Sequence, residues 1–569
     1  MRQKRGKFAK TLHGSERIEP KIEVFSTRYP DLLLHLQLTP FEKKNGTGSL
    51  QEALDWKKTL LLDKIQILYV YGLCGYYATV LMDWLKQDAG RHLIFLEDDL
   101  GALDAFSLMP AAKAILDHPQ IHLRWAASPQ EWDILLENCA SEFSFDKIEV
   151  SASKAYKKLP RFRKIKLSLL RKTVLWSALT NETILGHLLH DNIIPNLRRI
   201  PRCSYVNHWK DALKNVPIII CGAGPSLKTV ADELRKMRDR ALIIACGSAL
   251  SALSHLKIRP HLGIAIDPNE RELHCLSGCS YRDLPLLFGS RLYPKVFELF
   301  DGPYGYIRSG TGGPLESYVE NALGLDDPFV GYDLGREALS VTTLAVSLAN
   351  AWGCNPIIFA GVDMAYAREK HYAEGVPVKA QLNLQDKRSG EQMVRRKGAE
   401  GHLVTTLIKW IMEQGTIDRF AKNHSQTTFL NANPGGLGFK HIPYKPFQEI
   451  ITCAPCDYDK KIAQLLQQTK MKKTSAEVEK TLATLSSSLG RCLKLFQLLQ
   501  QEEPGSGKSV LYQTDLDLEV AYQLVLGSSK IALDRMGLKR DAHVVPDLME
   551  AQKWKFLEEA AQSYLKALK

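Results

Sequence analysis

The central part of the chain combines a glycine turn with side chains that can bind an anion. In PIIICGAGPSLKTV an apolar run ends at Cys221, and Gly222 and Gly224 permit a tight turn before a helix predicted to begin near Ser226. Free N–H groups at a helix start bind anions, and a serine hydroxyl there either caps the helix or donates to a phosphate. The segment alone predicts an anion site, with a plain strand-to-helix turn as the alternative.

Two aspartates follow later apolar runs. Asp267 ends HLGIAID, and Asp363 ends PIIFAGVD, with Tyr366 and His371 in the irregular stretch after it. In open α/β sheets ligands gather at the carboxyl ends of the strands, so Asp267 could bind a ribose or a metal–phosphate complex. Capping of a helix is its alternative role. His371 could act as a general base near neutral pH, whereas a lone histidine is more often structural or solvated.

A third candidate segment is SVTTLAVSLANAWG, a predicted helix that leads into the strand before Asp363. Ser340, Thr342 and Thr343 stand at its start. A helix N-terminus could hold a second anionic group here, and ordinary capping is the alternative.

Apolar runs alternate with helical patterns across this region, and such alternation predicts a mostly parallel sheet covered on both faces. The predicted strands are Pro217–Cys221, Ala241–Cys246, Leu262–Ile266, Leu284–Phe288, Pro356–Ala360 and Thr427–Asn431. Beyond residue 457 the spacing of Leu, Ile and Ala is helical. GSGKS in that part lacks the first glycine of a phosphate loop, because Glu502 stands there, so we expect an interhelical loop.

The amino-terminal part shows a second α/β pattern. Strands are predicted at Ile65–Val70, in HLIFLEDD and at Ile121–Trp125, with a glycine turn after the first and Glu97 at the end of the second. In dinucleotide-binding folds such a turn meets a phosphate and such an acid meets the ribose. Because Gly72 and Gly75 form only G-x-x-G, we expect a Rossmann-like domain without a cofactor, a live cofactor site being the alternative.

The length of 569 residues requires more than one domain. We predict an N-terminal α/β Rossmann-like domain with a helical bridge over residues 1–200, a central α/β domain over 201–450 and a C-terminal helical domain over 451–569. The basic run from Lys154 to Lys172 is a solvated face or meets an acidic partner or a membrane surface. Few aromatic residues accompany it, so nucleic-acid binding is not expected.

Cysteine spacing and hydropathy indicate the class of protein. The 11 cysteines lie mostly in apolar runs and are predicted to be buried free thiols in a reducing compartment. The close pairs Cys275/Cys279 and Cys453/Cys456 lack the spacing of a zinc site, so no metal is predicted. No apolar stretch suggests a signal peptide or a membrane span, and we expect a cytoplasmic protein.

Taken in order, IIICGAGPSL, IAIDP and SVTTLAVSLANAWGCNPIIFAGVDMAY, followed by His371, resemble the motility accessory factors (Maf proteins). These are bacterial flagellin glycosyltransferases, grouped with the archaeal 6-hydroxymethylpterin diphosphokinase-like (MptE-like) domain. The first motif also resembles the GPSL turn of bacterial sialyltransferases, which holds the cytidine nucleotide. The resemblance covers residues 205–445 well and implies a sialyltransferase-like, Rossmann-like central domain.

The resemblance implies transfer of a sialic-acid-like nonulosonic sugar from a CMP-activated donor to Ser or Thr of a flagellin-like or other surface protein. It implies no tightly bound cofactor and leaves a role for Mg²⁺ open. The implied nucleotide-binding residues are Gly222, Gly224, Pro225, Ser226, Asp267, Ser340 and Thr342, and the implied catalytic residues are Asp363, Tyr366 and His371, the last as base. Lys228 and Arg336 are predicted phosphate partners by position.

The chain departs from the family pattern at two places. Val362 stands where the family often has Gln, and Arg368–Lys370 replaces the usual small residues before the histidine. Two alternatives therefore stay open: a diphosphokinase that moves pyrophosphate from ATP to a pterin, and a catalytically silent nucleotide-binding protein of the same fold. The large flanking domains favour the transferase.

Overall fold

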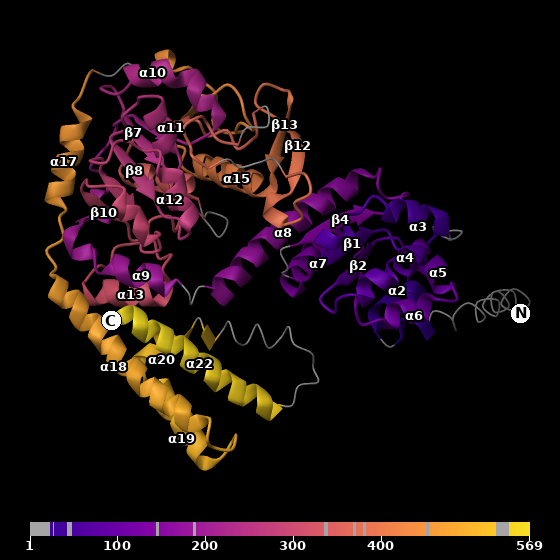
Figure 1. Cartoon of the computed structure of the whole chain (residues 1–569). Helices are drawn as coiled ribbons and strands as arrows, with labels where there is room; N and C mark the ends of the chain where they lie inside the picture. The colour runs from indigo at the N-terminus through magenta and orange to yellow at the C-terminus, as the bar shows by residue number, and fades with distance from the viewer. Residues whose placement is uncertain are drawn as a thin grey trace, which may run out of the picture. The chain divides into compact units, whose positions relative to one another are not determined.

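The computed structural model describes residues 23–26, 28–42, 48–143, 147–185, 189–334, 340–367, 371–378, 383–450, 454–527, 529–530 and 546–569. The chain forms two compact units (Figure 1). The first comprises Met1–Ala178 with Asn383–Met393, and the second comprises Leu179–Leu382 with Val394–Lys569. The predicted division into three domains stays a prediction.

The first unit is built on a parallel sheet with the strand order β3-β2-β1-β4. Its strands are β1 Ile67–Tyr71, β2 His92–Glu97, β3 Ile121–Trp125 and β4 Ile148–Ala152. Its helices are α2 Pro30–Leu38, α3 Leu50–Lys57, α4 Gly75–Lys86, α5 Leu100–Ser107, α6 Ala112–Asp117, α7 Pro129–Glu142 and α8 Pro160–Leu185, with a 3₁₀ turn η2 at Leu62–Lys64. The predicted strands are confirmed as β1 to β3. The sequence IEVSA of β4 alternates polar and apolar residues and was not predicted.

Among the described residues of the second unit, eight parallel strands form a sheet in the order β14-β11-β6-β7-β8-β9-β10-β5. The strands are β5 Ser204–Tyr205, β6 Ile218–Cys221, β7 Leu242–Cys246, β8 Leu262–Ala265, β9 Leu286–Phe288, β10 Tyr304–Tyr306, β11 Ile357–Ala360 and β14 Phe429–Asn431. All six strands predicted for this region are confirmed. The strands β5 and β10 are too short to give a periodic signal.

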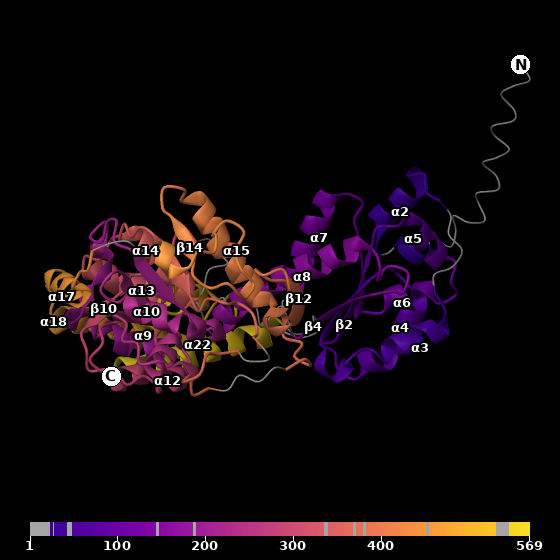
Figure 2. The same ribbon diagram turned by 90° about the horizontal axis from the view of Figure 1, so that it is seen from above.

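Alternate residues of these strands enter two separate cores, one on each face of the sheet. Ile219 and Ile243 belong to the core that also contains α9 His190–Leu197, α13 Gly313–Ala322 and the C-terminal helices. Ile218 and Ile244 belong to the opposite core, with α14 Val341–Ala351 and α15 Ile408–Asn423. The sheet is therefore covered on both faces, as its fully apolar strands predict. Figure 2 shows α14, α15 and β14 on one side of this unit.

The remaining helices connect these strands or follow the sheet. They are α10 Ala231–Lys236, α11 Ala249–His255, α12 Glu270–Leu276, α16 Phe447–Ile450, α17 Tyr458–Gln468, α18 Ser475–Leu499, α19 Gly507–Leu518, α20 Val520–Leu524 and α22 Pro546–Leu568, together with 3₁₀ turns η4 Ile200–Arg202, η5 Val206–Trp209, η6 Pro225–Val230 and η7 Pro294–Glu298. The 3₁₀ turn η8 Ser389–Glu391 belongs to the first unit. A hairpin joins β12 Met393–Lys397 to β13 Leu403–Leu407. The helices α18 and α22 run side by side (Figure 1).

The predicted interhelical loop around GSGKS is confirmed, although its end already belongs to a helix. The loop follows α18, and the Ser506 side chain caps α19, which begins at Gly507. This segment is a helix start without a preceding strand, so it is not a phosphate loop.

The described cysteines are free thiols, and all but Cys279 and Cys456 are buried. Cys453 lies outside the described residues. In the parts of the chain that the structure describes, no helix combines the length and the apolar composition needed to cross a bilayer.

The strand order reverses direction between β6 and β11. From β6 the chain adds β7, β8, β9 and β10 on one side, and then β11 and β14 on the other side. In doubly wound sheets this switch point opens the crevice in which ligands bind. The loops after β6 and β11 are the two segments with the predicted glycine turn and Asp363.

Candidate active site

Contacts between the loops after β6 and β11 close the switch point. The Gly222 N–H donates to the Ala360 carbonyl at 2.8 Å, and the Gly224 N–H donates to the Gly361 carbonyl at 2.7 Å. A Cβ added at Gly222 or Gly224 would lie 2.6 Å from the Gly361 oxygen. Both glycines are thus required for the contact between the loops, and their N–H groups already have backbone partners.

Asp363 fills the anion position of this turn. Its carboxylate accepts the Ser226 N–H at 2.9 Å and the Ser226 hydroxyl, and it accepts the Asn433 side-chain amide at 3.3 Å. Burial raises the pKa of Asp363, and the two bonds from Ser226 act in the opposite direction. Asn433 was not predicted as a site residue; it follows β14, the neighbour of β11 in the sheet.

The α-helix predicted to begin near Ser226 begins at Ala231 instead. Residues Pro225–Val230 form the 3₁₀ helix η6, in which the Leu227 N–H donates to the Gly224 carbonyl at 3.0 Å. Ser226 does not cap a helix, because its hydroxyl donates to Asp363.

A second group of acids lies at the ends of β7 and β8. Asp267 lies two residues beyond the end of β8. The residue as a whole is exposed, yet nearby protein atoms desolvate its carboxyl group and raise its pKa. Glu272 on α12 is 4% exposed, and burial together with the charge of Asp267 raises its pKa to about 8. Burial also raises the pKa of Glu413 on α15, which accepts the Ser340 hydroxyl. Glu272 and Glu413 have no sequence motif and were not predicted.

Three basic side chains act electrostatically on Asp267. Arg291, Lys409 and Arg271 each stabilise its ionised form. They come from the loop after β9, from the first turn of α15 and from α12. Opposite charges that converge at the carboxyl ends of a sheet can neutralise an anionic ligand. None of the three was predicted from the sequence.

His371 lies in a half-buried aromatic cluster. Its ring centroid lies 5.5 Å from that of Tyr366, 4.1 Å from that of Tyr372 and 4.8 Å from that of Trp410. Burial and the charges of Lys409 and Arg271 lower the pKa of His371 to about 4. The imidazole is therefore neutral at pH 7 and able to accept a proton. The structure thus brings the predicted residues Tyr366 and His371 together, and adds Tyr372 and Trp410 to them.

Ser340 and Thr343 form a capping box at the start of α14. The Ser340 hydroxyl accepts the Thr343 N–H at 3.1 Å, and the Thr343 hydroxyl accepts the Ser340 N–H at 3.2 Å. These contacts are ordinary capping, the alternative stated for this segment. Thr342 is half-buried in the first turn of α14.

Only one of the two predicted phosphate partners, Lys228, belongs to the described residues. Lys228 is exposed and its ammonium lies 3.4 Å from the Glu374 carboxylate. Arg336 lies outside the described residues, as do Arg368–Lys370.

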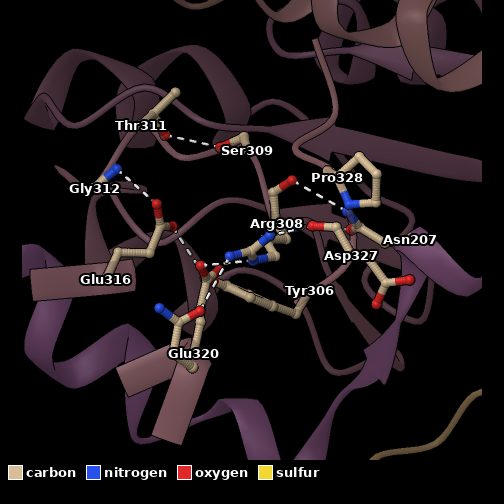
Figure 3. Close-up of polar contacts among 11 residues, drawn as sticks. Asn207, Tyr306, Arg308, Ser309, Thr311, Gly312, Glu316, Glu320, Asp327 and Pro328 are labelled. Atoms are coloured by element: carbon tan, nitrogen blue, oxygen red, sulfur yellow. Dashed lines mark hydrogen bonds and ion pairs between the residues drawn. The ribbon is translucent and has the colours of Figure 1, made fainter. Parts of the chain in front are cut away.

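A separate polar network lies at the end of β10 and the start of α13 (Figure 3). The Tyr306 hydroxyl lies 3.0 Å from Glu316 and 2.7 Å from Glu320, and Arg308 donates to Glu320 at 3.0 Å. Glu316 also accepts the Gly312 N–H at 2.9 Å. Burial and the charge of Glu316 raise the pKa of Glu320 to about 8. This network holds the loop after β10 against α13 through the chain's own carboxyl groups.

In the first unit, Glu97 is completely buried at the end of β2. Its carboxylate accepts the N–H groups of Leu73, Asp98 and Asp99 and the Tyr156 hydroxyl, at 2.7 to 2.9 Å. A Cβ added at Gly72 would meet Ser153 at 2.5 Å. The acid predicted to meet a ribose is thus engaged by its own chain.

No group of three or more His, Cys, Asp and Glu side chains with the arrangement of a metal site occurs within the described residues.

The comparisons with known proteins concern the second unit and the whole chain. Residues 191–369 match the family model of 6-hydroxymethylpterin diphosphokinase MptE-like proteins. Among solved structures, the Maf glycosyltransferase from Magnetospirillum magneticum AMB-1 is similar, with a TM-score of 0.43 and 14% identity, over 98% of this chain and 95% of that chain. No curated protein matches the sequence. The resemblance to the MptE-like family that the motifs predicted is therefore confirmed for residues 191–369, from α9 into the segment after β11.

Proposed function

We propose that this protein is a glycosyltransferase that moves a nonulosonic sugar from a CMP-activated donor to a Ser or Thr hydroxyl of a protein acceptor. The observation that carries the proposal is that Arg271, Arg291 and Lys409 all act electrostatically on Asp267, and that two of them, Arg271 and Lys409, also act on the neutral His371. The order of the sequence motifs supports the cytidine nucleotide and the sugar class.

The chemistry of such a transfer fits these side chains. The acceptor oxygen forms a bond to the anomeric carbon of the sugar, and the bond from that carbon to the phosphate oxygen breaks. The nucleotide leaves with the electron pair, and cations placed where this charge develops stabilise the transition state. Arg271, Arg291 and Lys409 are suited to that task.

The proton of the acceptor hydroxyl needs a base. We assign this role to His371, which is half-buried and neutral at pH 7, although its lowered pKa makes it a weaker base than an ordinary histidine. Asp267 is the second candidate, because a raised pKa makes its carboxylate a stronger base than an ordinary aspartate. The ring faces of Tyr366 and Trp410, whose centroids lie 5.0 Å apart, could pack against the base or the sugar.

The match of residues 191–369 to the pterin diphosphokinase-like family favours a second candidate function, transfer of pyrophosphate from ATP to a pterin. The same cations would then neutralise the triphosphate, and Mg²⁺ would be required.

A thermal-shift screen with CMP, CDP, ATP and GTP, with and without Mg²⁺, separates these functions because a ligand that binds the folded state raises the melting temperature. Selective stabilisation by CMP or CDP supports the transferase, and an ATP response that needs Mg²⁺ supports the kinase. Absence of any nucleotide response would overturn both. A nucleotide response without sugar transfer from a CMP-sugar to a Ser-containing or Thr-containing protein would indicate a catalytically silent binding protein.

A further inference from the structure

The hydrogen-bond donors of the turn after β6 differ in the type of acceptor that they bond. The N–H groups of Gly222, Gly224 and Leu227 donate to backbone carbonyls. These bonds belong to the packing of the two loops and cannot be given up without unfolding the turn. By contrast, the N–H and the hydroxyl of Ser226 both donate to a side chain, the carboxylate of Asp363. Among these donors, the N–H and the hydroxyl of Ser226 can therefore change partner when the Asp363 side chain rotates.

We propose that Asp363 is a positioning residue that competes with the phosphate of a nucleotide for the N–H and the hydroxyl of Ser226. The inference rests on the proposed function, which brings a nucleotide phosphate to this edge of the sheet. Binding of the phosphate moves the Asp363 carboxylate away from Ser226, and Asn433, which already donates to it at 3.3 Å, retains it.

The competition follows from charge and from hydrogen-bond geometry. An N–H group makes one good hydrogen bond, so a phosphate oxygen and a carboxylate oxygen exclude each other at the Ser226 N–H. Two anions side by side also repel each other strongly where water is scarce. Asp363 is 5% exposed and Ser226 is half-buried, so the repulsion is weakly screened while Ser226 remains within reach of a ligand.

The contacts of the Asp363 side chain are separate from those of its backbone. The carboxylate packs closely against Gly224, since a Cβ there would lie 2.6 Å from Cγ of Asp363. The backbone of Asp363 is fixed separately, because its carbonyl accepts the Leu437 N–H at 2.8 Å. The side chain can therefore turn while the loop after β11 stays in place.

The exchange concerns phosphate-bearing ligands alone. A nucleoside without a phosphate offers Ser226 no anion and leaves Asp363 where it is. A nucleotide must replace a bound carboxylate, so the carboxylate weakens nucleotide binding and leaves nucleoside binding unchanged.

Isothermal titration calorimetry of the full chain with CMP and with cytidine tests this inference. Asp363→Asn should bind CMP about tenfold more tightly than the wild type, because the competing charge is gone, and should bind cytidine equally well. Asp418→Asn is the matched control: Asp418 is also a buried aspartate that accepts backbone N–H groups, those of Lys440 and His441, on α15. This control should leave CMP affinity unchanged.

The outcomes separate the exchange from the proposed function. If the wild type binds CMP and Asp363→Asn binds it equally or more weakly, the exchange is wrong and the nucleotide site stands. If the wild type binds no nucleotide, both are wrong. Should ATP replace CMP as the stabilising nucleotide, the same comparison is made with ATP and adenosine. If Asp363→Asn does not melt cooperatively, Asp363→Ser removes the same charge and the same gain in affinity is expected.

Discussion

The two units contain glycine turns with the same parts and different properties. In each, a strand ends in a glycine turn, and an acid at the end of a hydrogen-bonded neighbouring strand accepts a backbone N–H of that turn: Glu97 with Leu73, and Asp363 with Ser226. A carboxylate has about four acceptor sites. Glu97 is fully buried and fills them with donors from separate residues, whereas Asp363 receives from the described residues two bonds from Ser226 and one from Asn433. The first carboxylate is a structural clamp and the second can be exchanged.

The largest effect expected from this difference is on stability. Glu97→Ala would leave one buried N–H group, two partly buried N–H groups and the Tyr156 hydroxyl without their acceptor, and we expect it to lower the free energy of unfolding by at least ~3 kcal/mol. Asp363→Asn keeps an acceptor for Ser226 and should lower it by about 1 kcal/mol. Urea unfolding followed by circular dichroism measures both, and equal losses would contradict the comparison.

The pH dependence of stability isolates the Glu97 clamp. Burial raises the pKa of Glu97 to about 7, from 4.5 in the unfolded chain. The unfolded state then loses its proton first as pH rises, so the contribution of Glu97 is most favourable below pH 4.5 and weakens by up to about 3 kcal/mol by pH 7. His122 acts oppositely: burial and His92 lower its pKa to about 3, so its stabilisation is lost as pH falls from 6.5.

His122 is present in both the wild type and Glu97→Gln. The difference between their unfolding free energies therefore cancels the contribution of His122 and leaves that of Glu97. Unfolding free energies from pH 4.5 to pH 7 should fall more steeply with pH, or rise less steeply, in the wild type than in the variant. Parallel pH profiles would show that Glu97 is ionised throughout this range. The hydrogen bonds to Glu97 would then lower its pKa by more than burial raises it.

The second turn is tested by ligand response. Ser226→Leu removes the hydroxyl and places a branched side chain beside Asp363, and we expect it to abolish the thermal shift produced by CMP while the melting temperature without ligand changes by only a few degrees. A variant that responds like the wild type would show that the turn after β6 is structural, like the one that holds Glu97.

The smallest effects concern the charges around Asp267. Lys409→Met keeps the length of the side chain and removes its charge. We expect CMP to bind about tenfold more weakly, as for the loss of one charge-assisted contact, and the pKa of His371 to rise from about 4 by less than one unit. Calorimetry and NMR titration of the imidazole measure the two effects. An unchanged pKa would place Lys409 too far from His371 to tune it.

The sequence allowed the sheet to be predicted more fully than the site. Runs such as IIIC and IIFA specify buried strands locally, and glycines and aspartates mark where those strands end. The partners in the site come from distant parts of the chain: Lys409 and Trp410 meet His371, and Glu413 meets Ser340. Only the folded chain brings such residues together, and none of them belongs to a motif.

The hydrogen-bond partners in the turn after β6 could not be predicted from the sequence either. Gly222 and Gly224 predict that another group lies close to the backbone, and a phosphate was expected there. The group that contacts them is the loop at Gly361. A carboxylate and a phosphate are both anions that accept hydrogen bonds from the N–H and hydroxyl groups of a turn. Local sequence therefore predicts the position of an anion without telling whether the chain supplies it.

The packing of the C-terminal helices has a consequence for synthesis on the ribosome. Phe496 on α18 and Trp554 on α22 share one core with Ile219 on β6 and with α9 and α13. That core stays incomplete until residues 546–568 have left the exit tunnel, more than 300 residues after β6. Apolar surface exposed for so long favours aggregation. The nascent chain is thus expected to depend on chaperones until its last described helix is made, and truncation before α18 should yield insoluble protein.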